Sequence, residues 1–283
     1  MKWKLGDLAG IGVYIHWSFW ILPAWLLLSS LGAGGGLASG LSMVALVFAV
    51  FGCVVLHELG HALMARKYGV GTHDITLYPI GGVARLERMP TRPSQELAIA
   101  LAGPAVNVVI AGALFVGFLF GGMRFQVSPL NLVAGSFLVN LLWINVALVV
   151  FNLLPAFPMD GGRVLRAFMA MRMPYDSATT IAARVGQGVA IVLGMVGFVT
   201  GSTLLLVALF VFLAARAELS MVRMRRAGWQ APTVSGAESA VWRPVANPHG
   251  HGDAEIVWVS EVRSTSLDGG TRQVVVFYPP PTR

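Results

Sequence analysis

The sequence predicts an all-α polytopic membrane protein with about six transmembrane helices. Of its 283 residues, 56% are hydrophobic and only 12% are charged. A soluble domain carries roughly twice that share, about 25% charged residues. The apolar residues also gather in stretches long enough to cross about 30 Å of hydrocarbon. Composition and patterning therefore agree on an integral, multi-pass membrane protein.

Six stretches are candidate spans, the last two of them short. They cover residues 13–31, 41–65, 96–121, 131–155, 185–200 and 202–217. The N-terminus shows no small-residue cleavage site of the kind that a secretory signal needs, so we expect the first span to be retained. The spans and their loops form one predicted membrane domain, residues 1–227, followed by a polar tail, residues 228–283.

Basic residues predict the orientation, because short loops rich in Lys and Arg stay on the cytoplasmic side. The N-terminus, the loops 66–95 and 156–184, and the segment after the last span all contain several. The alternate loops hold only Arg124. We therefore expect both termini in the cytoplasm, in the plasma membrane of a prokaryote. The net charge of +7 reflects these loops and not a nucleic-acid-binding surface.

Two segments outside the spans have strand-forming residues. Within the 66–95 loop, residues 73–78 and the following residues 79–84 are strand-forming and are interrupted by the diglycine Gly81-Gly82, which indicates a possible β-hairpin at the membrane face. In the tail, residues 256–262 and 273–278 flank Asp268-Gly269-Gly270, a second hairpin signal.

The second span carries the chemistry in the pattern His57-Glu58-Leu59-Gly60-His61. Histidines four residues apart lie on one helix face and can bind one zinc ion, with the intervening glutamate as general base. A histidine in an apolar helix is more often a core residue. Ionisable groups inside a membrane span are costly, however, and are functional by default. His57 lies nine residues before Arg66, about 13 Å along a helix, so the predicted site is inside the membrane near its cytoplasmic face.

A catalytic zinc needs a third protein ligand and an open position. A single cysteine, Cys53, excludes intrachain disulfides and Cys-rich zinc sites. The fourth span ends in Asn152-Leu153-Leu154-Pro155-Ala156-Phe157-Pro158-Met159-Asp160, where two prolines break the helix. Asp160 could turn back toward the metal, because broken helix at membrane depth lines protein or a wet cavity. On spacing alone, Asp160 could equally cap the following helix.

Together these motifs resemble the site-2 protease family. The resemblance covers roughly residues 1–220 and rests on His57 to His61, Pro79 to Gly82, Ala102-Gly103-Pro104 with Asn107, and Asn152 to Gly162. It implies a six-helix intramembrane metalloprotease with one Zn²⁺ per chain, held by His57, His61 and Asp160. It also implies that Asn152 positions the substrate or the oxyanion. We see no PDZ-like insertion, and the residues after Gly228 are too few for paired nucleotide-sensing modules, so regulation is not carried over.

The predicted activity is hydrolysis of peptide bonds within the transmembrane segments of membrane proteins, with Glu58 as the base. The Gly81-Gly82 hairpin would pair with an unwound substrate segment by strand addition. One alternative is a membrane zincin of the prenyl-protein or quality-control type, whose third ligand is a glutamate. No glutamate lies between Glu96 and Glu218. The other alternative is a non-enzymatic metal-binding membrane protein. The expected partners are a transmembrane substrate and the lipid bilayer, with no nucleic acid; the oligomeric state has no signature in the sequence.

Overall fold

A computed structural model describes residues 2–34, 36–79, 81–88, 90, 92–120, 137–229, 242–245, 257–265 and 271–277. The chain divides into two compact units, Met1–Arg223 and Met224–Arg283. This division lies four residues before the predicted end of the membrane domain at residue 227. Each unit is described by itself below.

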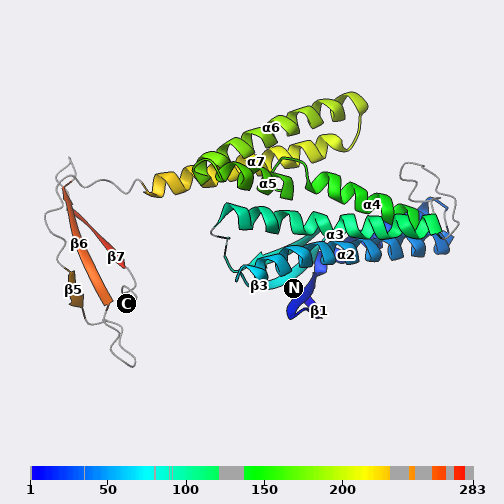
Figure 1. Ribbon diagram of the computed structural model, residues 1–283, viewed down its shortest axis with the longest axis horizontal. Helices are drawn as coiled ribbons and strands as arrows, with labels where there is room; N and C mark the ends of the chain where they lie inside the picture. The colour runs from blue at the N-terminus through cyan, green and yellow to red at the C-terminus, as the bar shows by residue number, and fades with distance from the viewer. Residues whose placement is uncertain are drawn as a thin grey trace. The chain divides into compact units, whose positions relative to one another are not determined.

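The first unit is mainly helical. Its helices are α1 (Ile21–Gly32), α2 (Gly36–Lys67), α3 (Pro93–Phe120), α4 (Phe137–Asn152), α5 (Asp160–Ala170), α6 (Tyr175–Thr200) and the start of α7 (Leu204–Trp229). A short 3-10 helix, Trp17–Trp20, precedes α1. α2 and α3 lie side by side, and α4 and α5 contact α3 (Figure 1).

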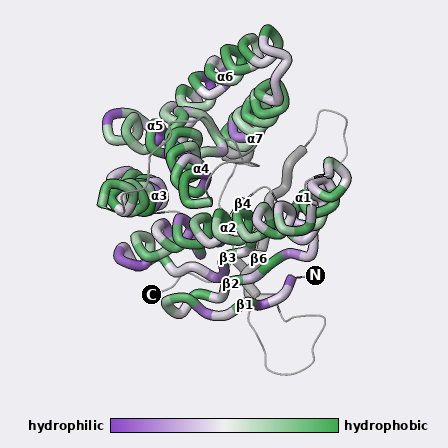
Figure 2. The backbone as a smooth tube through the Cα atoms, turned by 90° about the vertical axis from the view of Figure 1, so that its right-hand side faces the viewer, coloured by the Kyte–Doolittle hydropathy of each residue, from purple (hydrophilic) through white to green (hydrophobic). Residues whose placement is uncertain are grey.

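Four of these helices are long and apolar enough to cross a membrane: α2, α3, α6 and α7. Two further apolar helices, Trp17–Gly32 and Phe137–Asn152, are shorter. The structure therefore supports four of the six predicted spans by length, and whether the two shorter helices cross the membrane stays a prediction. Hydrophobic residues follow one another along most of the length of these helices (Figure 2). Phe120, Phe198 and Val199 are each at least 80% exposed, as expected where lipid replaces water.

The first predicted span, residues 13–31, is partly wrong because its first residues form a strand. Strand β2 (Ile11–His16) alternates buried and half-buried residues, and the helix α1 begins only at Ile21. The period of two places Ile11, Val13 and Ile15 on one face, where they are buried. Because these three side chains are buried against α2, the segment is stable as a strand, although its apolar residues alone would favour a helix.

The strands of the first unit form one sheet instead of an isolated hairpin. Its order is β1 (Lys2–Leu8), β2, β3 (Thr72–Tyr78) and β4 (Gly81–Leu86). β3 and β4 pair antiparallel, as the hairpin prediction requires, whereas β2 pairs parallel to β3. A parallel pair joins segments distant in sequence, here across two helices, and no local turn signal announces it. β1 and β4 are the two edge strands of the sheet.

The sheet packs on one side of α2. Val13, Ile15 and Leu77 cluster with Phe51 and Val55 of α2. A second cluster joins Ile11 and Ile75 to Ala62. Because contacts run from Phe51 to Ala62, the sheet lies along the segment of α2 that contains the His57-Glu58-His61 motif.

α3 lies against another side of α2 at very short range. A Cβ atom added at Gly60 would lie 2.7 Å from the carbonyl oxygen of Ala102. A glycine at this position thus lets the two backbones approach, as small residues do in membrane helix pairs.

The chain between α4 and α5 is an irregular loop, residues 153–159, with Ala156 and Phe157 buried. Ala156 packs with Ala190 of α6 and Val211 of α7, and Phe157 packs with Ala182 and Ala183 of α6. The loop is therefore held between helices, in keeping with its two prolines.

The second unit contains a three-stranded antiparallel sheet, β5 (Trp242–Val245), β6 (Val257–Thr265) and β7 (Thr271–Phe277). β6 and β7 overlap the two strand-forming runs predicted in the tail and pair with each other, whereas Asp268-Gly269-Gly270 and residues 256 and 278 lie outside the described residues.

Candidate metal centre

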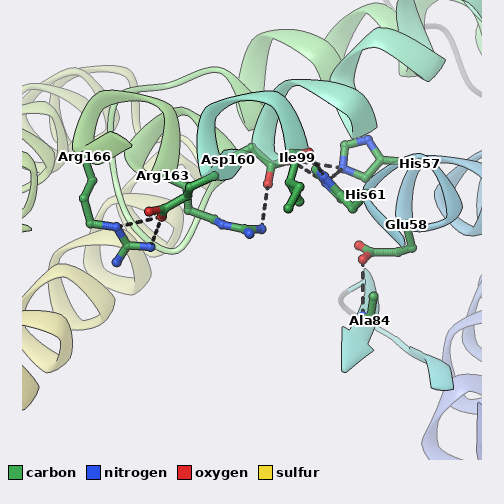
Figure 3. A network of polar contacts seen from close by, with 9 residues as sticks. His57, Glu58, His61, Ala84, Ile99, Asp160, Arg163 and Arg166 are labelled. Carbon is green, nitrogen blue, oxygen red and sulfur yellow. Dashed lines mark hydrogen bonds and ion pairs between the residues drawn. The ribbon is translucent and has the colours of Figure 1, made fainter. Parts of the chain in front are cut away.

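Two histidines and an aspartate converge between α2 and the start of α5. The Nε2 atoms of His57 and His61 lie 3.1 Å apart. Asp160 Oδ2 is 3.2 Å from the first and 3.1 Å from the second. All three residues are at most 7% exposed. Figure 3 shows both imidazoles directed toward the Asp160 carboxylate.

The outer nitrogen of each imidazole contacts a fixed oxygen. His61 Nδ1 lies 2.6 Å from the main-chain oxygen of Ile99 in α3. A main-chain oxygen can only accept, so Nδ1 of His61 must carry the proton. The neutral ring then presents the lone pair of Nε2 toward Asp160.

The same reasoning fixes His57 through two asparagines. Asn145 Nδ2 donates to the oxygen of Leu141, which leaves Asn145 Oδ1 to accept from Asn107 Nδ2 at 2.8 Å. Asn107 therefore turns its oxygen to His57 Nδ1, 2.5 Å away. Nδ1 of His57 donates, and its Nε2 also presents a lone pair to the centre.

Asp160 completes the set as a carboxylate. The positive charge of the Arg163 guanidinium, close to the carboxyl group, favours the ionised form. Arg163 Nη1 is 3.5 Å from the other carboxylate oxygen, Oδ1. Two nitrogen lone pairs and a carboxylate oxygen thus meet with no proton between them, an arrangement that calls for a cation.

The spacing fits zinc. Tetrahedral zinc with ligands at about 2.0–2.1 Å holds neighbouring ligand atoms roughly 3.3 Å apart. The three observed separations are 3.1 to 3.2 Å. A set of two imidazoles and one carboxylate also leaves a fourth position open, as in catalytic zinc sites. The group of His57, His61 and Asp160 could therefore hold a metal ion.

Asp160 does not cap a helix. It is the first residue of α5, and the N-cap position is occupied by Met159, which makes no side-chain cap hydrogen bond. Two glycines follow, and a Cβ at Gly161 would lie 2.2 Å from the oxygen of Leu154. Gly161 thus lets the start of α5 fold tightly against the preceding loop, which turns Asp160 toward α2.

Gly103 of α3 leaves room for the centre. An added Cβ would lie 2.2 Å from His61 Nε2 and 2.8 Å from His57 Nε2. Any larger residue would occupy the space in which the imidazoles meet.

Glu58 lies one residue along α2 from His57 and points to the sheet. Its Oε2 accepts a hydrogen bond from the main-chain N–H of Ala84 in β4, at 3.2 Å (Figure 3). A Cβ at Gly82 of the same strand would lie 2.9 Å from Glu58 Cγ. Gly81 has φ of +142°, a conformation that other residues rarely adopt. The diglycine thus brings β4 next to Glu58.

Asn152, predicted to position the substrate or the oxyanion, makes none of the contacts described above. It is the last residue of α4, half-buried, and makes no side-chain hydrogen bond within the described part of the chain. Conversely, the sequence analysis did not predict the contacts of Asn145 or of the Ile99 carbonyl with the site. Asn145 is a polar residue in an apolar span and could have been noticed, whereas a main-chain oxygen leaves no trace in the residue types.

Comparison with known proteins places these features in a family. The family model described as peptidase family M50 matches residues 45–125 and 124–193. The zinc metalloprotease MJ0392 of Methanocaldococcus jannaschii is 35% identical over 222 residues, which cover 78% of this chain and 61% of that protein. The Synechocystis protein sll0528 is 36% identical over 208 residues, 69% of this chain and 52% of that protein. The chain therefore spans between half and two thirds of the length of these relatives.

A solved structure is also similar, that of the site-2 protease from Methanocaldococcus jannaschii. It aligns with a TM-score of 0.55 and 36% identity over 77% of this chain and 95% of that one. The family match and these identities show that the chain belongs to peptidase family M50, the site-2 protease family of zinc metalloproteases.

Proposed function

We propose that this chain is a zinc-dependent intramembrane endopeptidase, which hydrolyses peptide bonds within the transmembrane segments of membrane proteins. One observation carries the proposal: the acceptor atoms of His57, His61 and Asp160 converge inside an apolar helix bundle, with a carboxylate, Glu58, on the next residue. A structural metal site has no use for that extra carboxylate.

In this proposal His57, His61 and Asp160 hold one zinc ion per chain. A zinc ion bound there supplies Lewis acidity, which lowers the pKa of a water molecule and polarises a substrate carbonyl. Glu58 takes the proton from the attacking water and later returns it to the leaving amine. Its hydrogen bond to Ala84 N–H holds the carboxylate between the metal centre and β4.

The substrate segment has to unwind, because the carbonyls of an intact transmembrane helix are sealed in hydrogen bonds. β4 is an edge strand of the sheet, and its Ala84 N–H points to Glu58 of α2. In the proposal an extended substrate segment adds to this edge next to Gly81 and Gly82, which leave the space that side chains would fill.

Asn152 is proposed to orient the substrate or to donate to the oxyanion from its amide. It is close to Asp160 in sequence, across the proline-containing loop, and its amide makes no other side-chain hydrogen bond within the described residues. Such a free donor is what this role requires.

The proposed setting is the plasma membrane of a prokaryote, with both termini in the cytoplasm. The helix α2 continues unbroken from His57 to Lys67, so the centre lies about 13 Å before the basic residues that end the span. The proposed site therefore lies inside the bilayer and opens to the cytoplasmic side.

The structure disfavours a zincin with a glutamate as third ligand. Glu218, the glutamate that such a site would use, accepts a hydrogen bond from Arg166 Nη1 at 2.9 Å and does not join the histidines. If Asp160→Asn kept zinc while Glu218→Gln lost it, that alternative would be correct after all.

The decisive experiment compares Glu58→Gln with Glu87→Gln, an exposed glutamate in the loop after β4. Both purified variants should bind one equivalent of zinc. Cleavage of a model transmembrane substrate should fall by about 10²- to 10⁴-fold in Glu58→Gln, the usual contribution of a general base, and stay unchanged in Glu87→Gln. A zinc-loaded Glu58→Gln enzyme with full activity would disprove the proposed role of Glu58.

A further inference from the structure

Arg166 of α5 is buried at the junction of several helices. The residue is only 3% exposed, although an arginine inside a membrane protein is costly without partners. Its Nε donates to Glu96 Oε1 at 2.9 Å, and its Nη2 donates to the same oxygen. Its Nη1 donates to Glu218 Oε1 at 2.9 Å. One guanidinium thus joins α5 to α3 and α7.

Two aromatic rings lie beside this guanidinium. Arg166 Cζ lies 5.1 Å from the ring centroid of Phe157 and 5.1 Å from that of Tyr175. A guanidinium stacks on rings and donates in a fixed fork, whereas a lysine ammonium can do neither. The contacts therefore specify the position and rotation of α5, and not only its charge balance.

The residues in contact, Phe157 and Arg166, lie on either side of Asp160 in the sequence. Phe157 lies three residues before Asp160, in the loop, and Arg166 lies six residues after it, on the same short helix. The stacking of Arg166 on Phe157 therefore holds both sides of the turn that presents Asp160. A shift of α5 would move Asp160 away from the histidines.

Glu96, the acidic partner of Arg166, lies on α3, the helix that orients the His61 ring. Glu96 is three residues before Ile99 on α3, and the Ile99 oxygen accepts from His61 Nδ1. The Arg166–Glu96 ion pair thus connects the helix that supplies Asp160 to the helix that sets the His61 ring. Glu218 of α7 is more exposed, at 26% of its side chain, and has no such connection.

We propose that Arg166 is a positioning residue for the metal centre, which acts through Glu96 and Phe157 to hold Asp160 at coordinating distance from His57 and His61. This inference rests on the proposed zinc site. The sequence analysis interpreted the basic residues of the 156–184 loop only as orientation signals. The inference gives one of them, Arg166, a role in metal affinity.

The test measures zinc affinity by chelator competition in purified full-length protein, beside thermal unfolding of the metal-free form. Arg166→Lys keeps the charge but loses the stack and the fork, so zinc affinity should fall by about 10- to 100-fold, as for other residues that support metal ligands. For a model substrate kcat should fall with KM unchanged. Arg172→Lys is the matched control, since Arg172 is exposed and stacks on Phe168 outside the cluster. It should change neither quantity.

Glu96→Gln and Glu218→Gln separate positioning from general stability. Positioning predicts a larger loss of zinc affinity for Glu96→Gln, whereas a purely structural ion-pair cluster would lower the unfolding temperature of the metal-free forms and leave zinc affinity alike in both. Wild-type zinc affinity in a folded Arg166→Lys protein would overturn the inference. Asp160→Asn distinguishes the two proposals: if it too keeps wild-type affinity, the proposed zinc site itself is wrong.

Discussion

His57 Nδ1 and Asn107 Oδ1 lie 2.5 Å apart, although fifty residues separate them in the chain. The contact fixes which ring nitrogen of His57 carries its proton, and so directs the other nitrogen to Asp160. Asn145 in turn holds Asn107 at 2.8 Å. The orientation of a candidate metal ligand on α2 therefore depends on side chains from α3 and α4.

Substitution of Asn107 should weaken metal binding without preventing folding. In Asn107→Ala the His57 ring loses its acceptor, and zinc affinity should fall by about 10- to 100-fold in a chelator competition. Asn145→Ala, one contact further from the ring, should cost less. Equal zinc affinity in Asn107→Ala and wild-type protein would contradict the importance of this contact.

Gly103→Ala should abolish zinc binding. The added Cβ would lie 2.2 Å from His61 Nε2, and backbone packing of α3 on α2 leaves little room for the ring to retreat. Gly112→Ala on the same helix is the control, because nothing lies within 4 Å of its Cβ position. That control should bind zinc normally and unfold at the same or a slightly higher temperature, since alanine favours a helix by up to about 1 kcal/mol over glycine.

Gly82→Val should separate catalysis from metal binding. Its Cβ would lie 2.9 Å from Glu58 Cγ and 3.0 Å from Val54 Cγ1, so either Glu58 or β4 must move. We expect kcat to fall at least about tenfold, because a general base that is displaced from the water loses most of its contribution to the rate. Zinc content should stay at one equivalent. Val83→Ala, at an exposed neighbour, should leave kcat unchanged, and a fully active Gly82→Val enzyme would show that β4 need not approach Glu58.

Removal of the metal should lower stability in a way that depends on Asp160. A ligand that binds only the folded state adds about 2.7 kcal/mol of stability at a free concentration 100 times its Kd. Chelation should therefore lower the unfolding temperature of the wild-type protein in detergent. Asp160→Asn should unfold at one temperature whether zinc is present or chelated. A zinc-dependent shift of wild-type size in that variant would remove Asp160 from the ligand set.

Local sequence patterns predicted much of the fold. Long apolar stretches identified α2, α3, α6 and α7 because a helix must satisfy its own backbone in lipid. Strand-forming residues interrupted by a diglycine predicted the β3–β4 pair, although Gly81 and Gly82 lie in β4, paired with Tyr78 and Leu77, and not in the turn. The N-terminal strands were missed, since residues 13–16 were interpreted as the start of the first span, and only their parallel partner, β3, shows that they form a strand.

The same distinction between local pattern and tertiary packing applies to the candidate metal centre. The sequence by itself determined that His57, Glu58 and His61 share one turn of a buried helix, because their spacing is a property of the helix alone. Only the tertiary structure decided that Asp160 faces these histidines instead of capping α5, that Asn107 and the Ile99 oxygen set the two rings, and that Arg166 holds the helix of Asp160. Those contacts join residues 38 to 103 positions apart, and such distances are closed by the packing of helices, which no local pattern encodes.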